Sequence, residues 1–593
     1  MDSIGAIVKK MESDYIVGNT EISKYVTFDQ YENLNTIDAY LNSKHVSGPK
    51  DSLGREKPFF NIVTAAVNIW YRATNIARNK IRIKAVEYSQ YVHAFIGTIH
   101  IQEWMKREHF EEFLDRWGMT LARYGSALVK FVEKDGKLEP SVIPWNRIIC
   151  DALEFEGNPC IEKLEFTQAQ LRNSGYDKEQ VGALIDALTP RKTIGRQSRD
   201  NKSDYITLYE VHGEFPLSFL TDQEDDENTF VQQIHIISFA STKTDGEKTT
   251  FTLYKGKEKN PYIMTHLIKE DNRTQGIGAV EHLFQAQWMT NHSMKLIKDQ
   301  LDLASRLIFQ TADSSFVGKN ILKSIVSGDI LVHNENQPLQ SIANNAHDIT
   351  ALQNFASQWQ ILGQQITSTP DAVRGNTQPS GTPFRAIALE NQEGKSLFEV
   401  MKRTKKRYLE EMMRKFVIPH VNKKMDTSEE IAATLESQDI TKLDSLYVPN
   451  EAIRRDNEQI KKTVLSGGIA QNLDLKATQA QIQDELSQLG NQRFLKPSDI
   501  STKTWKEVLK GLEWEVEIDI NDKETDDQLV LQSLIDWFKI IANPTVQQYM
   551  STPQGKVISS RILEKTNAIS PLELSSLPAP TPITQSQPLT STQ

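Results

Sequence analysis

Apolar side chains in the first 268 residues follow helical spacing at first and strand spacing later. Helical intervals of three and four occur in residues 58–83 (Phe59, Ile62, Val63, Ala66, Val67, Trp70) and again in residues 101–123. Short β-rich runs follow in residues 127–151, where Asp135-Gly136 indicates a hairpin turn, and in 205–215, 230–240, 250–256 and 262–268. Residues 1–268 therefore predict an α+β domain.

A long stripe of a different character begins at Gly276. Residues from Val280 to Ile308 recur on one helical face over roughly thirty residues, which at ~1.5 Å per residue gives a helix about 45 Å long. Gln287, Asn291 and His292 lie near its middle, and such polar side chains are unusual in the core of a monomer. The pattern predicts a helix that packs, partly wetted, against copies of itself.

Two further helices follow a small module at residues 309–348, in which 328–334 is strand-like. Residues 349–366 have the most regular amphipathic pattern of the chain, and a second long helix is expected from Phe384 to Val421, capped by Thr382-Pro383 and interrupted at Pro419. Between them, residues 367–383 are rich in Pro, Gly, Ser and Thr and contain almost nothing that could enter a core.

The C-terminal part is predicted to be mostly helical. Residues 425–567 carry helical patterns with one alternating strand at 514–520 and a final helix at 526–544. The remaining Pro/Ser/Thr-rich residues are expected to form a disordered tail.

Composition and charge narrow the class of protein. The 593 residues are 38% hydrophobic and 25% charged, enough apolar material for several cores, and the net charge is -10. An acidic chain does not coat nucleic acid through a global positive field, although local basic contacts stay open. The two cysteines, Cys150 and Cys160, suit a reducing compartment and are expected to be buried small residues. We expect no signal peptide and no membrane span.

The chain lacks the common signatures of catalysis and cofactor binding. Gly394-Lys395-Ser396 ends like a phosphate loop, but Leu389 occupies the position of its first glycine, and the triplet falls within a predicted helix. Gly276-Ile277-Gly278 is better explained as a helix start than as a dinucleotide loop. We therefore expect no enzyme, no cofactor and no metal. The basic run Lys402, Arg403, Lys405, Lys406 and Arg407 is interpreted as a solvated helix face, with contact to phosphates or an acidic neighbouring subunit as the alternative.

The order of these parts resembles the portal proteins of tailed bacteriophages. The segment QPSGTPFRAIALENQEGKSLF (378–398) is similar to the portal turn that starts the long helix, and YGSALVKFVEKDGKLEPSVIPWNRIICD (124–151) is similar to the hairpin of the portal wing. The resemblance divides the chain into nine parts: wing 1–275, stem helix 276–308, clip 309–348, second stem helix 349–367, tunnel loop 368–383, long helix 384–424, a wing-return helical region with one strand 425–525, crown helices 526–567, and disordered tail 568–593. The polar stretch 172–204 departs from the family as a long insertion.

This resemblance implies an α+β, mainly helical subunit of a ring, dodecameric as in the family, at one vertex of a virion. The ring would be assembled in the host cytoplasm and would pass double-stranded DNA without sequence specificity. Its partners would be the terminase large subunit, the major capsid protein and tail adaptors. The residues carried over are Arg374, Asn376, Gln378 and Ser380 facing DNA; Lys319, Lys323 and Asp329 on the clip; and Trp288, Leu301, Phe355 and Trp359 in stem packing, with the polar residues of the first stem helix facing a neighbour or the channel.

Two other interpretations remain open at this stage. One is a capsid-associated or scaffolding protein that oligomerises through its helices without forming a channel. The other is an enzyme whose site is too dispersed in sequence to recognise.

Overall fold

The computed structural model divides the chain into two compact units, Met1–Ile518 and Asp519–Gln593. The described residues all belong to the first unit. They are residues 3–518 apart from 19, 25, 53, 85–89, 189–204, 222–228, 242–247, 305–307, 311, 313, 315–334, 338–339, 343–348, 370–383, 426–430, 435–436, 469–474, 491 and 500–503. The predicted strand 328–334, the helix 526–544 and the tail therefore lie outside the described residues.

A three-stranded antiparallel sheet contains the predicted hairpin. Its strand order is β11-β4-β5, formed by Tyr262–His266, Ser126–Lys134 and Lys137–Ile143. Asp135 and Gly136 make the turn with φ of 50° and 71°, values that glycine and aspartate tolerate better than most residues. This confirms the turn predicted from the sequence.

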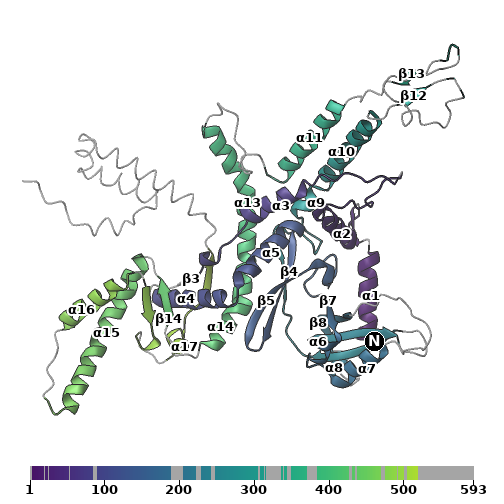
Figure 1. Cartoon of the computed structure of the whole chain (residues 1–593). Helices are drawn as coiled ribbons and strands as arrows, with labels where there is room; N and C mark the ends of the chain where they lie inside the picture. The colour runs from purple at the N-terminus through teal and green to yellow at the C-terminus, as the bar shows by residue number, and fades with distance from the viewer. Residues whose placement is uncertain are drawn as a thin grey trace, which may run out of the picture. The chain divides into compact units, whose positions relative to one another are not determined.

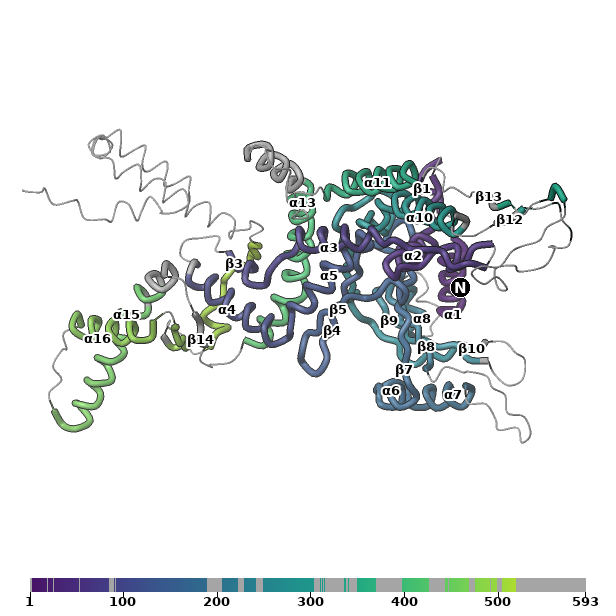
Figure 2. Tube along the Cα trace, turned by 45° about the horizontal axis from the view of Figure 1, so that its top comes forward, coloured from purple at the N-terminus to yellow at the C-terminus, as the bar shows by residue number. Residues whose placement is uncertain are grey.

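A second sheet has five antiparallel strands and is covered on both faces. The order β10-β9-β8-β7-β6 comprises Lys248–Gly256, Phe230–Ser241, Tyr205–Pro216, Cys160–Thr167 and Ile148–Ile149, with the short helix α8 (Ser218–Thr221) after β8 and the 3-10 turn η3 (Trp145–Arg147) before β6. Helices α6 (Gln168–Arg172) and α7 (Lys178–Leu188) lie next to each other beside the strands (Figure 2). Both contribute side chains to one apolar cluster on one face of this sheet. Helix α1 (Ile4–Val17) places Val8 against the other face. Because Val181, Leu184 and Ile185 of α7 are buried in the first of these clusters, the expectation of a purely polar insertion at 172–204 is wrong for α7.

The N-terminal helices differ in part from the prediction. Helix α3 covers Val63–Ala73 only, and the expected helical continuation is instead the 3-10 turn η1 (Arg78–Lys80) and strand β3 (Ile81–Lys84). Residues 101–123 are divided between α4 (Tyr91–Arg107) and α5 (Phe110–Tyr124), because His109 adopts a left-handed conformation with φ of 50°. The remaining elements are α2 (Gln30–Leu41) and the hairpin β1 (Thr20–Ser23) and β2 (Val26–Phe28).

A tight crossing joins this region to the helices that follow. An ideal Cβ on Gly278 would lie 2.4 Å from the carbonyl oxygen of Arg123, and one on Gly125 would lie 2.4 Å from the carbonyl carbon of Ile277. Both glycines are therefore required for the backbones to approach each other. Gly278 is the N-cap of α9 (Ala279–His282), which confirms that Gly276 and Gly278 precede a helix start.

The two helices that the resemblance assigns to a stem form a pair. Helix α10 (Phe284–Ala304) and helix α11 (Ile349–Ile366) run side by side, and the short strands β12 (Ile308–Gln310) and β13 (Gln340–Ile342) pair antiparallel between them in sequence (Figure 1). The bounds of α11 match the prediction. The prediction of a single helix from 276 to 308 is wrong. The helix is interrupted at Leu283, between α9 and α10, and strand β12 begins at Ile308.

The long helix that follows is α13 (Phe384–Met412), which begins at the predicted residue and includes Gly394-Lys395-Ser396. A π-helical turn, η7 (Met413–Val417), and α14 (Ile418–Lys424) continue it. Pro419 lies in the first turn of α14, where its missing N–H is tolerated, so the predicted interruption takes the form of a π-turn.

The C-terminal part of the described chain contains more strands than predicted. Helices α15 (Ser437–Leu465), α16 (Leu475–Gln488) and α17 (Trp505–Val508) occur with the 3-10 turn η8 (Pro497–Asp499), strands β14 (Ile431–Thr434) and β15 (Gln492–Leu495), and β16 (Glu515–Ile518). The expectation of one strand in 425–525 is therefore wrong. Strand β16 pairs with β3, so this return segment completes a two-stranded sheet with residues more than four hundred positions earlier.

Candidate functional site

A glycine allows close approach of α10 and α11 where the last turn of α11 meets the first turn of α10. An ideal Cβ on Gly363 would lie 2.9 Å from Leu283 Cδ2 and 3.3 Å from Ala286 Cβ, so a glycine permits this distance between the helices. This contact places the end of α11 beside the start of α10, and the pairing of β12 with β13 joins their opposite ends, so the two helices are antiparallel. Beyond α11, Trp70 Nε1 donates to the carbonyl oxygen of Thr367 at 2.9 Å, which ties the pair to α3.

Helix α11 presents a row of large apolar side chains away from the core. Phe355, Trp359, Leu362 and Ile366 recur at intervals of three and four and therefore share one helical face. Phe355, Leu362 and Ile366 are 40%, 45% and 54% exposed. We call these four residues the α11 row. Their exposure is unusual, because the apolar face of an amphipathic helix is normally buried against the rest of the protein.

Helix α10 carries a second, shorter row. Trp288 and Leu296 are exposed, and His292 lies between them with its ring parallel to the indole at a centroid distance of 5.2 Å. At about 100° per residue, this α10 row lies on the side of the helix turned away from Leu283 and Ala286, the contacts of α11. The helix pair therefore offers two different apolar surfaces.

The polar residues in the middle of α10 have a structural role within the same chain. Gln287 accepts from the Ile62 amide at 2.9 Å and donates to the Phe60 carbonyl at 2.6 Å, while Asn291 accepts from the Phe60 amide at 2.9 Å. Both side chains are buried. The expectation that they face a neighbouring copy or a channel is therefore wrong for Gln287 and Asn291, although His292 is exposed.

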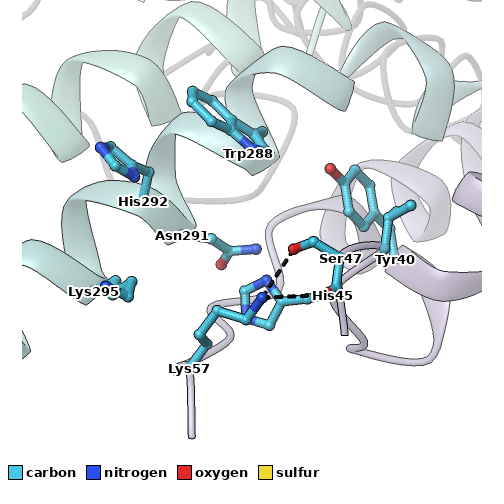
Figure 3. A pocket seen from close by; sticks show the side chains of 9 residues that line it. Tyr40, His45, Ser47, Lys57, Trp288, Asn291, His292 and Lys295 are labelled. Atoms are coloured by element: carbon cyan, nitrogen blue, oxygen red, sulfur yellow. Dashed lines mark hydrogen bonds between the residues drawn. The ribbon is translucent and has the colours of Figure 1, made fainter. Parts of the chain in front are cut away.

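A cavity of about 310 Å³ lies where the buried hydrogen bonds of Asn291 meet the exposed α10 row. It is lined by residues of two segments that are distant in sequence: Tyr40, His45, Val46, Ser47 and Lys57 from one, and Trp288, Asn291, His292 and Lys295 from α10. In Figure 3, Trp288 and His292 lie on one side of the space, and Asn291 and Lys57 point into it. Lys57 Nζ donates to Ser47 Oγ at 2.8 Å, and His45 Nε2 lies 3.0 Å from the Pro58 carbonyl oxygen.

The site residues predicted from the resemblance fall into two groups. Trp288, Leu301 and Phe355 are at least 40% exposed, and Trp359 is half-buried beside Phe355 at a ring distance of 6.2 Å. The predicted DNA-facing residues (Arg374, Asn376, Gln378, Ser380) and clip residues (Lys319, Lys323, Asp329) lie outside the described residues.

The basic run on α13 is only partly a solvated face. Arg403 and Arg407 are not buried, but Lys402 and Lys405 are, and Lys405 is 1% exposed. Lys405 Nζ donates to the Thr74 carbonyl at 3.1 Å and lies 5.1 Å from the Trp117 ring centroid, next to Gly118, where a Cβ would approach it to 2.9 Å. Burial lowers the pKa of Lys405 to about 7, an effect that the charge of Asp115 only partly offsets. The sequence held a signal for this, since Lys405 lies four residues after Met401 and four before Leu409, on the apolar face.

A second buried lysine lies between the two sheets, and apolar spacing alone did not reveal it. Lys130 Nζ binds Glu162 Oε2 at 2.8 Å and Glu210 Oε1 at 2.7 Å, and the same carboxylates bind Tyr262 and His212. Burial opposes ionisation here, but His212 and Lys130 lower the pKa of Glu210 to about 2, and the two carboxylates raise the pKa of Lys130. Cys150 and Cys160 are buried in the adjacent cluster as free thiols, as predicted.

Comparison with known proteins identifies no relative: no protein-family model matches the chain, and no curated protein matches it in sequence. Two physical findings also bear on function. In the described part of the chain, no helix combines the length and the apolar character needed to span a bilayer. The same residues contain no cluster of three or more His, Cys, Asp or Glu side chains placed to hold a metal ion.

Proposed function

We propose that this protein is the portal protein of a tailed bacteriophage, a ring at one capsid vertex through which terminase packages DNA and from which DNA later leaves toward the tail. The observation that carries the proposal is the pair of exposed apolar rows on α10 and α11. The resemblance in sequence assigns these two helices to the stem, the part through which portal subunits surround their channel.

The two rows differ from each other, and this favours a ring over a symmetric dimer. A two-fold dimer needs one surface that is complementary to itself, whereas two different complementary surfaces generate a head-to-tail contact that is repeated from copy to copy. The α11 row of one copy packed on the α10 row of the next would bury Phe355, Leu362 and Ile366 against Trp288 and Leu296. Burial of apolar area at about 25 cal/mol per Å² would supply the driving force.

The net charge agrees with a channel that lets DNA move. A strongly basic lumen would release many counterions from DNA and hold it, whereas a chain with net charge -10 leaves only local basic contacts. In this proposal residues 368–383 are the tunnel loop and 309–348 are the clip that meets terminase and the tail adaptors. The protein itself would not hydrolyse ATP.

The α11 row provides the test of assembly. We expect Ile366→Glu to place a charge at the contact between copies and to convert the assembly of the full chain into monomers, as measured by mass photometry at a fixed protein concentration. The matched control is Val464→Glu on α15, which replaces an apolar side chain of similar exposure (58%) and should leave the assembly intact.

The same experiment separates the portal from a scaffolding oligomer. A closed ring gives one discrete mass, whereas a head-to-tail contact that does not close gives open polymers of many masses. A monomeric wild-type chain, or an assembly that Ile366→Glu leaves unchanged, would contradict the role given to α11.

A further inference from the structure

The cavity between Lys57 and Trp288 is a feature that the proposed function does not explain, although Trp288 and His292 also belong to the α10 row. Its volume of about 310 Å³ is at the lower end of the range for small-molecule sites, and it lies between two parts of the chain that are more than 200 residues apart. The walls are fixed by the buried Asn291, whose Oδ1 accepts from the Phe60 amide. A rigid wall of this kind favours a preformed site.

The lining of the cavity is rich in hydrogen-bond donors and cations. It contains two lysines, two histidines and an asparagine amide, and none of its nine residues carries a carboxylate. The ammonium of Lys57 is held by the hydroxyl and carbonyl oxygens of Ser47, at 2.8 and 3.5 Å, and these neutral partners leave its charge in place.

Carboxylates near the cavity are matched by other cations. Asp51 and Asp299 both bind Arg55, at 2.9 and 3.1 Å, and Lys295 Nζ lies 2.9 Å from Asp299 and 3.9 Å from Asp51. Arg55 and Lys295 thus pair with Asp51 and Asp299. Asp302 adds a third carboxylate near Arg55, and Lys57 places its positive charge in the cavity. A partly exposed pair such as Lys295–Asp299 is worth less than about 1 kcal/mol, so Lys295 is able to turn to another anion.

The aromatic wall supplies the second recognition element. His292 lies parallel to the indole of Trp288, and 53% of the Trp288 surface is exposed at the edge of the cavity. An exposed indole next to a cation is suited to a ligand that has both a flat ring and an anionic group, since the ring stacks while the anion accepts hydrogen bonds.

We propose that this cavity binds a nucleoside monophosphate, with its base on Trp288 and its phosphate between Lys57, Lys295 and Asn291. Phosphate suits this donor set because it offers three acceptor oxygens and close to two negative charges at neutral pH. Base stacking on an aromatic side chain is worth about 1–3 kcal/mol, so both halves of the ligand contribute. Because Trp288 also belongs to the α10 row, the site is open in the unassembled chain, and its occupation does not require the ring.

The test is calorimetric titration of the full-length protein with AMP, adenosine and inorganic phosphate in separate experiments, each repeated with Ile366→Glu, in which no neighbouring copy covers Trp288. We expect AMP to bind more tightly than either adenosine or phosphate. Lys57→Gln should weaken AMP binding about tenfold, because it removes a charge-assisted hydrogen bond. Trp288→Leu should weaken it about tenfold through lost stacking.

The matched control is Lys298→Gln. Lys298 is on the same helix and donates to the Glu56 carbonyl, but it does not line the cavity, so this variant should bind AMP as the wild type does. Unchanged circular dichroism and melting of each variant show that folding is retained. The proposal is overturned if AMP fails to bind, if phosphate alone binds as tightly as AMP, or if Lys298→Gln weakens binding as much as Lys57→Gln.

Discussion

Replacement of Lys405 by methionine is the sharpest test of how α13 is held in the molecule. Lys405 is buried against α3 and α5, where the Thr74 carbonyl is a neutral acceptor and the Trp117 ring lies beside the ammonium. Methionine has a similar length, fills the same space without a charge and loses one hydrogen bond. The variant therefore separates the cost of burying a charge from the packing of the side chain.

The size of the effect follows from the pKa of Lys405. Burial lowers this pKa from 10.5 to about 7. Between these two pH values, Lys405 therefore binds a proton more readily when α13 is locally unfolded and the side chain is in water (the opened state) than when α13 is packed in the native structure. The free energy of opening therefore increases with pH over this window, by up to about 1.4 kcal/mol per pH unit. From about pH 7 to about pH 9.5 the increase amounts to roughly 3 kcal/mol, whereas the methionine side chain of the variant does not titrate.

The other groups around Lys405 do not produce the same dependence. Asp115 faces it from α5 and accepts a hydrogen bond from Tyr71 of α3 at 2.7 Å, and Lys402 lies one turn earlier on α13. Burial and the bond to Asp115 raise the pKa of Tyr71 to about 12, so Tyr71 stays neutral across the window. Any change of these groups with pH also occurs in the variant and cancels in the comparison.

The assay is hydrogen exchange of peptides from residues 398–412, measured on wild type and Lys405→Met at pH 7, 8 and 9.5. We expect the variant to be more protected at pH 7 and this advantage to shrink as the pH rises. Lys406→Met is the control, because Lys406 is half-exposed and paired with Glu410 at 3.7 Å, and its effect should be small at each pH. A ratio of protection between wild type and Lys405→Met that does not change with pH would refute the argument.

Three further predictions concern separate parts of the molecule. Lys130→Met should destabilise the two sheets by about 3–5 kcal/mol in urea unfolding, since it removes the buried cation that Glu162 and Glu210 share. Lys134→Met at the exposed end of the same strand should have little effect. Gly182→Ala in α7, where a Cβ meets open space, should stabilise the protein by about 0.5–1 kcal/mol. Gly363→Ala should not stabilise it, because the added methyl group would collide with Leu283 and Ala286. Equal effects of the two substitutions in a thermal melt would contradict the close packing of α10 and α11. Residues 371–380 are part of the tunnel loop that the resemblance assigns, and their deletion should leave the cooperative thermal transition and the assembly unchanged. It should impair packaging of DNA in an infected cell. Loss of the cooperative thermal transition would show that these residues belong to a core.

The sequence predicts elements well where their stabilising contacts are local. The bounds of α11 and the hairpin at Asp135-Gly136 follow from apolar spacing and turn chemistry. Strand β3 was predicted as helix because Ile81–Lys84 is too short to reveal its alternation, and its partner β16 lies more than four hundred residues away. The break at His109 was missed because a left-handed residue outside glycine leaves no pattern in one sequence.

The site was predictable to a smaller degree. Apolar spacing identified the two helices and the residues of the α11 row, and the resemblance supplied Trp288 of the α10 row, but neither showed which residues the rest of the chain covers. Gln287 and Asn291 were assigned to a neighbour because their partners, the backbone groups of Phe60 and Ile62, come from a distant segment. Lys405 was assigned to a solvated face because charge is a stronger signal than position on the helix, and only the structure places Thr74 and Trp117 around it.

The central claim is that copies of this chain form a closed ring around a channel. Negative-stain electron microscopy of the purified full-length protein tests it most directly. The account predicts uniform rings with a central hole in the wild type and in Val464→Glu, and their loss in Ile366→Glu. Compact single particles without a hole in the wild type would contradict it.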